Sequence, residues 1–562
     1  MRVAYSTLFA DSQSKVDGTS VEASDVSIDP FHPVNSASSM GRPIMEDMSA
    51  DAADSAGNPS SATAGTTAAT ATTPRQVRRR RSTNAPKPPV LQQAIKKLSP
   101  KQIVGFVLGL VLFLVPFIVD VPGLAEPGER MLAIFLLAIV FWVLEPIPLT
   151  ATAVLVILLE VLLVSNGAIV DPTGGDAALA DTVLPAADYF AALANPVIIL
   201  FLGGFMIAHG AEKYGMDRNL ASVMLKPFPS SARMTVLGLM LITALLSMFM
   251  SNTATTATMF AVVIPILKSL PAGKARAGVA LAIPLAANVG GIGTPVGTPP
   301  NAIAIGVLQE HGISISFTQW MALAVPYMLV VLAIAWVLLC LTFIPKDARI
   351  EIDMESRWNT ALDAKVFYAI AGLTILLWVS EPLHGVSSNI VGFFPVVALL
   401  ALQVMKGKDV QALDWPVLWL VSGGIALGTG VGATGLDAWL VGSVDWTSLS
   451  GLAILATLGL IGFGLANVIS HSAAANLLVP LAVSLAVSLD NVNPLLVAVV
   501  VAIACSVGMS MPISTPPNAI AYATGEITIG QMAFIGLVVG GVATALLIFA
   551  APPLWAALGL VG

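Results

Sequence analysis

Two clusters of polar side chains interrupt apolar parts of this chain. The first, MSNTATTATM at residues 250–259, holds hydroxyl and amide groups without a charge, and the second, SHSAAA at 470–475, is shorter. Neutral oxygen atoms bind hard cations, and the free N–H groups at the start of a helix favour an anion. The residue types therefore predict the binding of an anion together with a cation such as Na⁺.

Each cluster is followed by a Thr-Pro-Pro-Asn motif, GTPPN at 297–301 and STPPN at 514–518. A proline pair cannot continue a helix, and the residue before a proline is pushed out of the helical region. Thr298 and Thr515 are placed to cap the helix that starts after each break. We therefore expect two broken helices, 278–292 with 299–308 and 495–509 with 516–523.

The elements that must position these residues lie in a membrane. The chain has 562 residues, of which 56% are hydrophobic and only 10% charged, and its mean hydropathy is +0.86. Soluble globular chains carry about 25% charged residues. Apolar runs such as 103–119 approach the roughly 20 residues that a membrane-spanning helix needs. Further spans are predicted at 131–146, 149–164, 196–211, 320–344, 366–382, 388–405, 415–431 and 532–556.

The first hundred residues differ from the rest. Residues 1–74 are rich in Ser, Ala, Thr and Asp, and a basic run, RQVRRRRSTNAPKPP, follows at 75–89. This composition predicts a disordered, basic, cytoplasmic tail over 1–100, before a first span at 101–119. A basic cluster before a span is typical of a topology signal and of contact with anionic membrane lipid, and nothing else in the sequence supports nucleic-acid binding.

Two apolar regions, 234–267 and 451–487, are each about two half-helices long and hold the polar clusters near their centres. We predict that both are re-entrant hairpins, which enter and leave the membrane on the same side. With a cytoplasmic N-terminus, this topology puts the loops rich in Lys and Arg inside and leaves only Arg130 outside. A full crossing at 234–267 would put the next two basic loops on the wrong side.

The sequence also repeats itself weakly. FWVLEPIP at 141–148 resembles LWVSEPLH at 377–384, and the polar clusters and Thr-Pro-Pro-Asn motifs follow in the same order. Because Glu145 and its counterpart Glu381 fall near opposite faces of the membrane, the two repeats are predicted to be inverted, as in many secondary transporters. The predicted domains are a first repeat at 120–344, a cytoplasmic linker at 345–365 and a second repeat at 366–562.

Five motifs in this order, EPIPLTATAVL, FLGGFMIAHGAEKYG, SNTATT, GTPPN and TPPNAIAYATG, resemble those of the divalent anion/sodium symporter (DASS) family, the INDY-type sodium-dependent dicarboxylate transporters. The resemblance covers residues 100–560. It implies an all-α polytopic membrane protein, an inverted-repeat secondary transporter with two re-entrant hairpins and two broken helices. It further implies a scaffold, an elevator-type transport domain and a homodimer in the cell membrane.

The resemblance also implies a function and a set of site residues. The family imports C4-dicarboxylates such as succinate, malate and fumarate with two or more Na⁺ ions. The family positions that bind substrate fall on Asn252, Thr253, Thr298, His471, Ser472 and Thr515. Those of the first sodium site fall on Ser247, Ser251, Asn252 and Gly297, and those of the second on Ala466, Ile469, His471 and Ser514.

The second cluster departs from the family pattern. We call the break at the centre of each predicted hairpin its tip, the first at the cluster 250–259 and the second at the cluster 470–475. Family members carry Ser-Asn-Thr at both tips, whereas the second tip of this chain has Ser470, His471 and Ser472. Ala466 stands where a hydroxyl is common. The presence of His471 allows three interpretations. In the first, a neutral imidazole replaces the amide as a hydrogen-bond partner. In the second, the imidazole changes the selectivity among anions, and in the third, a proton replaces one sodium ion.

Glu160, in VILLEVLLV, is an acid deep in a predicted span. An acid within a membrane is a functional candidate. Because Glu160 falls in the scaffold that the resemblance implies, rather than at the polar clusters, we predict that it makes a hydrogen bond at a dimer interface.

Other classes of function find less support. An intramembrane enzyme would need a Ser/Lys or Ser/His pair, two facing Asp residues or HExxH, and the neighbours Ser470 and His471 point apart on a helix. A pump would need GxxxxGK[ST], which the sequence lacks. We therefore predict no catalytic residues and no organic cofactor. Two alternatives stay open, a sodium- or proton-coupled carrier or exchanger for citrate, sulfate or another di- or trivalent anion, and an anion channel.

Overall fold

The computed structural model describes residues 99–561, except 229–230, 271–272, 347, 351–356, 444–445 and 490. The chain divides after Pro86 into two units, and all described residues belong to the second unit, Lys87–Gly562. Residues 1–98, which make up nearly all of the predicted tail, lie outside the described residues.

The described part of the chain is built from helices, and its only β-pairing is one isolated bridge between Ser231 and Arg349. Eight of its helices are long and apolar enough to cross a membrane. The predicted class, an all-α polytopic membrane protein, is thereby confirmed.

The helices of the first half follow the predicted spans closely. The first predicted span ends in a short 3₁₀ turn at Val115–Phe117. The helices are α2 (Pro100–Leu114), α3 (Glu126–Leu144), α4 (Leu149–Leu163), α5 (Ala186–Ala191), α6 (Pro196–Lys213), α7 (Met216–Leu225), α8 (Ala232–Ser247), α9 (Asn252–Ser269), α10 (Lys274–Gly291), α11 (Pro299–Glu310) and α12 (Phe317–Thr342).

The second half repeats this order. The predicted span 532–556 is not one helix, because Pro552 and Pro553 end it at Ala550 and start a new turn. The helices are α13 (Leu362–Val379), α14 (Glu381–His384), α15 (Ser388–Ala401), α16 (Gly407–Gln411), α17 (Trp415–Ala433), α18 (Leu436–Gly442), α19 (Gly451–Val468), α20 (His471–Val487), α21 (Pro494–Ser506), α22 (Pro516–Ala523), α23 (Ile529–Phe549) and α24 (Ala551–Ala557).

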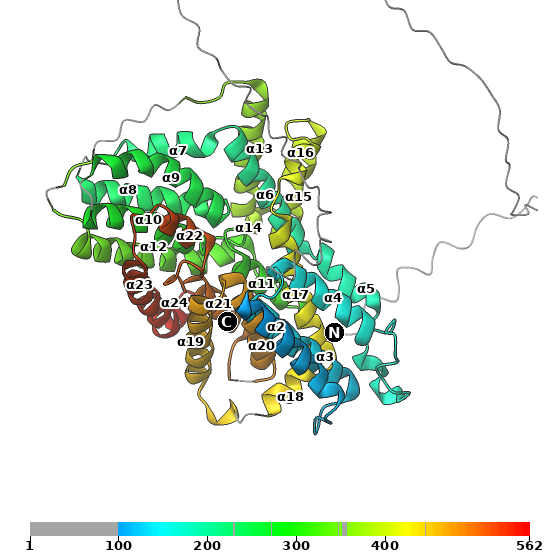
Figure 1. Cartoon of the computed structure of the whole chain (residues 1–562). Coiled ribbons are helices and arrows are strands. Elements are labelled where there is room, and N and C mark those ends of the chain that lie inside the picture. Colours follow the sequence, from blue (N-terminus) through cyan, green and yellow to red (C-terminus); the bar gives the residue numbers. More distant parts are fainter. Residues whose placement is uncertain are drawn as a thin grey trace, which may run out of the picture. The chain divides into compact units, whose positions relative to one another are not determined.

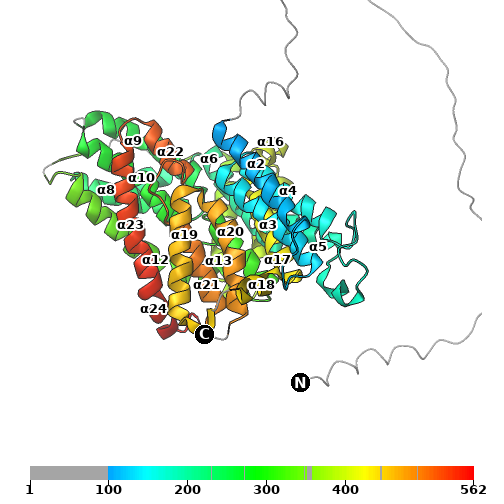
Figure 2. The ribbon, with the colours of Figure 1, turned by 60° about the horizontal axis from the view of Figure 1, so that its bottom comes forward.

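The two halves exchange partners. Helix α6 of the first half packs on α15 of the second, and α17 of the second packs on α4 of the first. Small residues allow both contacts, since a Cβ on Gly203 would collide with the carbonyl of Gly392, and a Cβ on Gly423 would collide with Ala153. Figures 1 and 2 both show α2–α5 on one flank and α8, α9, α12 and α23 on the other. The reciprocal pairing is what a pseudo-twofold relation between repeats produces.

Both predicted hairpin regions are helix pairs with a short break. Helices α8 and α9 are separated by residues 248–251, and α19 and α20 by residues 469–470. The break in each pair falls at the polar cluster, as expected from the sequence. That each pair returns to the side of the membrane from which it entered stays a prediction.

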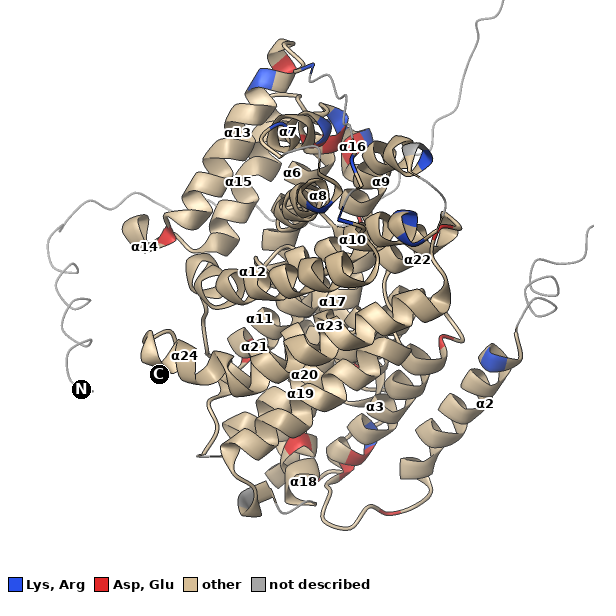
Figure 3. Cartoon of the chain, turned by 90° about the vertical axis from the view of Figure 1, so that its left-hand side faces the viewer, with Lys and Arg blue, Asp and Glu red and all other residues tan. Residues whose placement is uncertain are grey.

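Basic residues lie mainly along one side of the described part of the chain, near α7, α16 and the start of α2 (Figure 3). Helix α3, which carries Arg130, begins away from that side, near α18. The Arg130 guanidinium donates to the carbonyls of Leu163 and Val170 and pairs with Glu126 at 2.5 Å. This distribution agrees with the predicted loop charges, although the orientation of the N-terminus stays a prediction.

Glu160 corrects one prediction. Its side chain is fully buried within this chain, against Gly430 of α17, and neither carboxyl oxygen has a hydrogen-bond partner among the described residues. A group with no exposed surface cannot reach a second subunit, so the predicted dimer-interface bond is wrong. Burial of an ionised carboxylate without a partner is costly, so this is an unusual place for an acid.

Candidate functional site

The first polar cluster starts helix α9. The Ser251 hydroxyl accepts a hydrogen bond from the N–H of Ala254 at 3.2 Å, which is the usual contact of an N-cap serine. The preceding helix ends at Ser247, and the hydroxyl of Thr294 donates to the carbonyl of Met248 in the break. The chain therefore leaves the helical conformation here because side chains, rather than the next turn, satisfy its backbone groups.

Oxygen atoms converge behind this tip. The Ser247 hydroxyl lies 2.6 Å from the amide oxygen of Asn252 and 2.8 Å from the carbonyl oxygen of Ala287. The amide atom of Asn252 that faces them also lies 3.2 Å from the carbonyl oxygen of Gly297. One hydroxyl proton cannot serve two acceptors. The amide nitrogen of Asn252, when turned inward, donates to all three neighbouring oxygens, whereas a cation would be needed among these groups when the amide oxygen faces them.

The groups from Ser247, Asn252, Ala287 and Gly297 form what we call the oxygen set, and two glycines make room for it. A Cβ on Gly291 would lie 2.5 Å from the Asn252 amide oxygen, and a Cβ on Gly297 would collide with the carbonyl oxygen of Gly291. Among the described residues, no three His, Cys, Asp or Glu side chains gather as a metal site. The candidate cation site is thus built from neutral oxygen atoms, which suit a singly charged hard cation.

The second polar cluster begins α20 in the same way. The Ser470 hydroxyl accepts from the N–H of Ala473 at 3.2 Å. Behind the tip the chemistry changes, because His471 Nε2 lies 2.9 Å from the carbonyl oxygen of Gly508. A carbonyl only accepts, so Nε2 carries the proton and the imidazole acts as a donor. Ala466 occupies the position that corresponds to Ser247, so the second tip has a methyl group where the first has a hydroxyl. A Cβ added to Gly508 would lie 2.5 Å from this methyl group.

The two Thr-Pro-Pro-Asn motifs open α11 and α22, as predicted. Thr515 accepts from the N–H of Asn518 at 3.3 Å. Thr298 occupies the equivalent N-cap position, but its side chain makes no capping bond. The predicted side-chain cap is therefore correct for Thr515 and wrong for Thr298. The Thr298 hydroxyl does not make that contact, and Thr298 and Thr515 both line a cavity between the two tips.

The asparagines of these motifs hold the breaks together, a role that the sequence reading missed. The Asn301 amide donates to the carbonyls of Gly291, Ile292 and Thr294 at 3.0, 3.3 and 2.8 Å. The Asn518 amide donates to two carbonyls of the other break, at 2.8 and 3.0 Å. Their presence in both motifs was the available signal, because a break in a helix leaves carbonyls that need donors.

One cavity of about 160 Å³ lies where the tips and the proline motifs meet, and we call it the inner cavity. The predicted residues that line it are Ser251, Asn252, Thr253, Gly297, Thr298, His471, Ser472, Ser514 and Thr515. Ser247, Ala466 and Ile469 do not line it and are buried behind the tips. Sequence reasoning missed Phe201, Phe205, Asp414 and Val417, which close the cavity from α6 and the start of α17.

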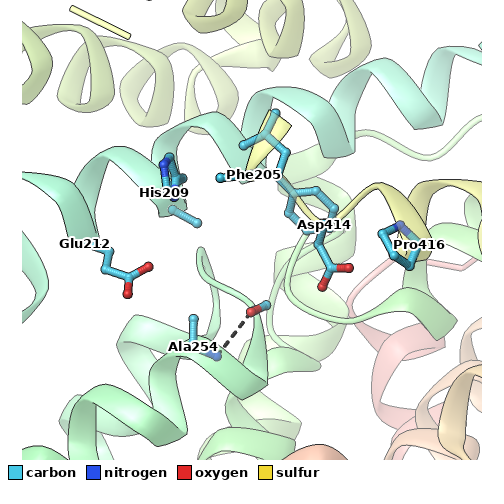
Figure 4. Close-up of a pocket in the computed structure, with 10 residues that line it drawn as sticks. Phe205, His209, Glu212, Ala254, Asp414 and Pro416 are labelled. Atoms are coloured by element: carbon cyan, nitrogen blue, oxygen red, sulfur yellow. Dashed lines mark hydrogen bonds between the residues drawn. The ribbon is translucent and has the colours of Figure 1, made fainter. Parts of the chain in front are cut away.

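A second cavity of about 280 Å³, the outer cavity, adjoins the inner one and shares Phe205, Ser251 and Asp414 with it. Figure 4 shows His209 and Glu212 on α6 on one side of this space and Asp414 on the other. Neighbouring protein atoms displace water from the Asp414 carboxyl, which raises its pKa. His209 lies 3.5 Å from Asp409, and Lys213 pairs with Asp409 at 2.8 Å.

Comparisons with known proteins identify a family and several relatives of this chain. Residues 100–561 match the family model described as the sodium:sulfate symporter transmembrane region. The sodium-dependent dicarboxylate transporter SdcS of Staphylococcus saprophyticus is 29% identical over 480 residues, which are 78% of this chain and 89% of that protein. The protein of the same name from Staphylococcus aureus strain USA300 is 29% identical over 482 residues, with the same shares.

Among solved structures, the YdaH transporter of Alcanivorax borkumensis is similar to this chain with a TM-score of 0.48 and 14% sequence identity. The match covers 74% of this chain and 99% of that one.

Proposed function

Because this chain belongs to the sodium:sulfate symporter family, we propose that it imports a C4-dicarboxylate, such as succinate, malate or fumarate, across the cell membrane together with Na⁺. Family membership makes the chain a transporter and not an enzyme. The dicarboxylate follows from the relatives, since the two staphylococcal proteins are named sodium-dependent dicarboxylate transporters.

The oxygen set behind the first tip is the observation that carries the proposal. Ser247, Asn252, Ala287 and Gly297 bring polar oxygen atoms together at one point, and the Asn252 amide can turn either its nitrogen or its oxygen toward them. A sodium ion bound by these oxygens, with the amide oxygen of Asn252 turned toward it, would place a positive charge directly behind the wall of the inner cavity. Because Asn252 belongs both to the oxygen set and to that wall, ion and anion would stabilise each other's binding.

The inner cavity supplies the rest of an anion site. No Lys or Arg is found among the described residues that line it. Helices α9, α11, α20 and α22 all begin at its wall, so their free N–H groups and positive dipole ends face the same space. A permanent cation there would be costly whenever the site is empty. Co-bound sodium avoids that cost because it arrives with the substrate, which is the basis of coupling.

The substrate would contact both tips. We propose that Asn252, Thr253 and Thr298 hold one carboxylate and that His471, Ser472 and Thr515 hold the other. Ser514 and the backbone of the second tip would form a second, weaker sodium site. The N-terminus would be cytoplasmic, as the distribution of Lys and Arg over the loops predicts. The protein would work as a homodimer with an elevator-type transport domain, as the family resemblance implies.

Uptake by reconstituted protein tests this proposal. Proteoliposomes that contain the full chain would be given an inward gradient of NaCl, LiCl or choline chloride, with radiolabelled succinate, citrate or sulfate outside. We expect succinate to accumulate above its external concentration only with sodium, and a sodium ionophore to abolish the accumulation. Equal uptake with choline chloride, or equilibration without accumulation, would contradict sodium coupling and favour the anion channel.

A further inference from the structure

Asp414 occupies an unusual place for an acid in a protein that binds anions. It is the residue immediately before α17, and it lines both the inner and the outer cavity. Among the described residues, only Phe205 and Ser251 share that position with it. An anion that passes between the two cavities must therefore pass close to the Asp414 carboxyl.

No positively charged side chain neutralises Asp414 in the described part of the chain, where its carboxyl makes no salt bridge. The other ionisable groups that line the outer cavity are His209 and Glu212. Lys213, the residue after Glu212, is already paired with Asp409 at 2.8 Å. The passage between the cavities thus carries net negative charge when His209 is neutral.

We propose that Asp414 is a specificity-determining residue that selects against anions of higher charge and strengthens the binding of sodium. This inference rests on the proposed function. The carboxylate attracts Na⁺ to the oxygen set, which shares Asn252 with the inner cavity, and repels an anion whose charge has not yet been offset. The repulsion grows with the charge of the anion, so a trianion is disfavoured more than a dianion.

Asp414 as a whole residue keeps contact with solvent, even though neighbouring atoms crowd its carboxyl group, so the size of the effect is limited by screening. Removal of its charge should change each affinity by about three- to tenfold rather than by orders of magnitude. The direction distinguishes this role from a structural one. Loss of a purely structural residue weakens all ligands together, whereas loss of this charge should strengthen the binding of the anion and weaken that of the cation.

The test uses the full chain as wild type, Asp414→Asn and Asp414→Glu. Three quantities are measured: the succinate concentration for half-maximal uptake at saturating sodium, the sodium affinity without anion from tryptophan fluorescence at constant ionic strength, and the ratio of citrate to succinate uptake at neutral pH. For Asp414→Asn we expect tighter succinate, weaker sodium and a higher citrate ratio, each by about three- to tenfold. Asp414→Glu should retain the wild-type values.

Glu212→Gln is the matched control, because Glu212 lines only the outer cavity. It should change each quantity by less than about twofold. Unchanged values for Asp414→Asn, or a parallel loss of sodium and succinate affinity, would overturn the role of Asp414 while leaving sodium coupling intact. If the wild-type protein shows no sodium-dependent uptake of succinate, citrate or sulfate, the proposed function fails instead.

Discussion

The two tips begin alike and differ behind their first turn. In both, a serine caps the second helix, and a Thr-Pro-Pro-Asn motif closes the opposite wall. Behind the first tip, Ser247 and Asn252 contribute oxygens to one set. At the corresponding positions the second tip has the Ala466 methyl group and the His471 imidazole, which donates to Gly508.

The difference shows that a repeated backbone does not impose repeated chemistry. The first tip gathers a hydroxyl, an amide and two carbonyl oxygens, a set that can bind a cation when the Asn252 amide oxygen faces it. The second tip satisfies its carbonyl with the N–H of His471, so the need for a cation there is smaller. This geometry shows His471 as a hydrogen-bond donor at the position of an amide, a contact that a neutral and a protonated imidazole can both make, so the choice among the three interpretations stays a prediction.

The largest expected effect concerns the residue before Thr-Pro-Pro-Asn in each half. Gly297 has no room for a Cβ, because the added atom would meet the backbone oxygen of Gly291. The corresponding residue of the second half, Ser514, has a side chain, which donates to the carbonyl of Asn467 at 3.2 Å. Gly297→Ser should therefore abolish sodium-dependent uptake, and Ser514→Gly should retain most of it. Uptake in proteoliposomes with equal protein content measures both. Similar activity of the two variants would mean that the tips are equivalent.

The next effect concerns the side chains at the tips. Asn252→Ala removes a ligand that we place in both the sodium and the anion site, which should cost about 1.5–3 kcal/mol and weaken sodium affinity roughly 10- to 100-fold. His471→Ala should weaken succinate binding more than sodium binding. The sodium and succinate dependence of uptake for the two variants measures this split. The proposed asymmetry is wrong if both variants change sodium affinity to the same extent.

A third prediction concerns a feature that the two halves share. Asn301→Ala and Asn518→Ala each leave two or three break carbonyls without their donor, so each should destabilise the protein by about 1–3 kcal/mol. The loss of apparent thermal stability in detergent should be similar for the two variants. Gln319→Ala, which removes a single bond to the carbonyl of Leu560, serves as the control and should give a smaller shift. A large difference between the asparagine variants would show that the halves differ in stability as well as in chemistry.

The smallest expected effect comes from making the second tip resemble the first. The double variant Ala466→Ser/His471→Asn restores the hydroxyl and the amide, and it should tighten the sodium dependence of uptake by about two- to fivefold. Because Ala466 is fully buried close to Gly508, the single variant Ala466→Ser reports the cost of the added atom. Sodium dependence that stays at the wild-type value would show that the second tip does not contribute to cation binding.

Much of the fold could be predicted from the sequence because membrane helices and helix breaks have strong local signals. Apolar runs predicted the spans, and the proline pairs predicted the starts of α11 and α22 to the residue. The polar clusters coincided with the breaks between α8 and α9 and between α19 and α20. The split at Ala550 was missed, although Pro552 and Pro553 were its signal.

The site was harder to predict where it depends on tertiary contacts. Phe205 and Asp414 border the inner cavity because α6 and the start of α17 approach the first tip, and no local pattern marks that approach. The burial of Glu160 is a similar case, since its neighbour Gly430 lies far away in the sequence. Composition can suggest that an acid is unusual, but only the packing of other helices shows what surrounds it.

The exchange of partners between the halves has a consequence for how this polypeptide could be divided. Helix α6 completes its packing only with α15, and α17 only with α4, at contacts too close for larger residues. Neither repeat is therefore a self-sufficient module, and a fragment that ends in the 345–365 linker would leave the Gly203 face of α6 and the Ala153 face of α4 without their partners. Two such fragments made in the same cell should instead associate and recover the interlocked architecture without a covalent link between them.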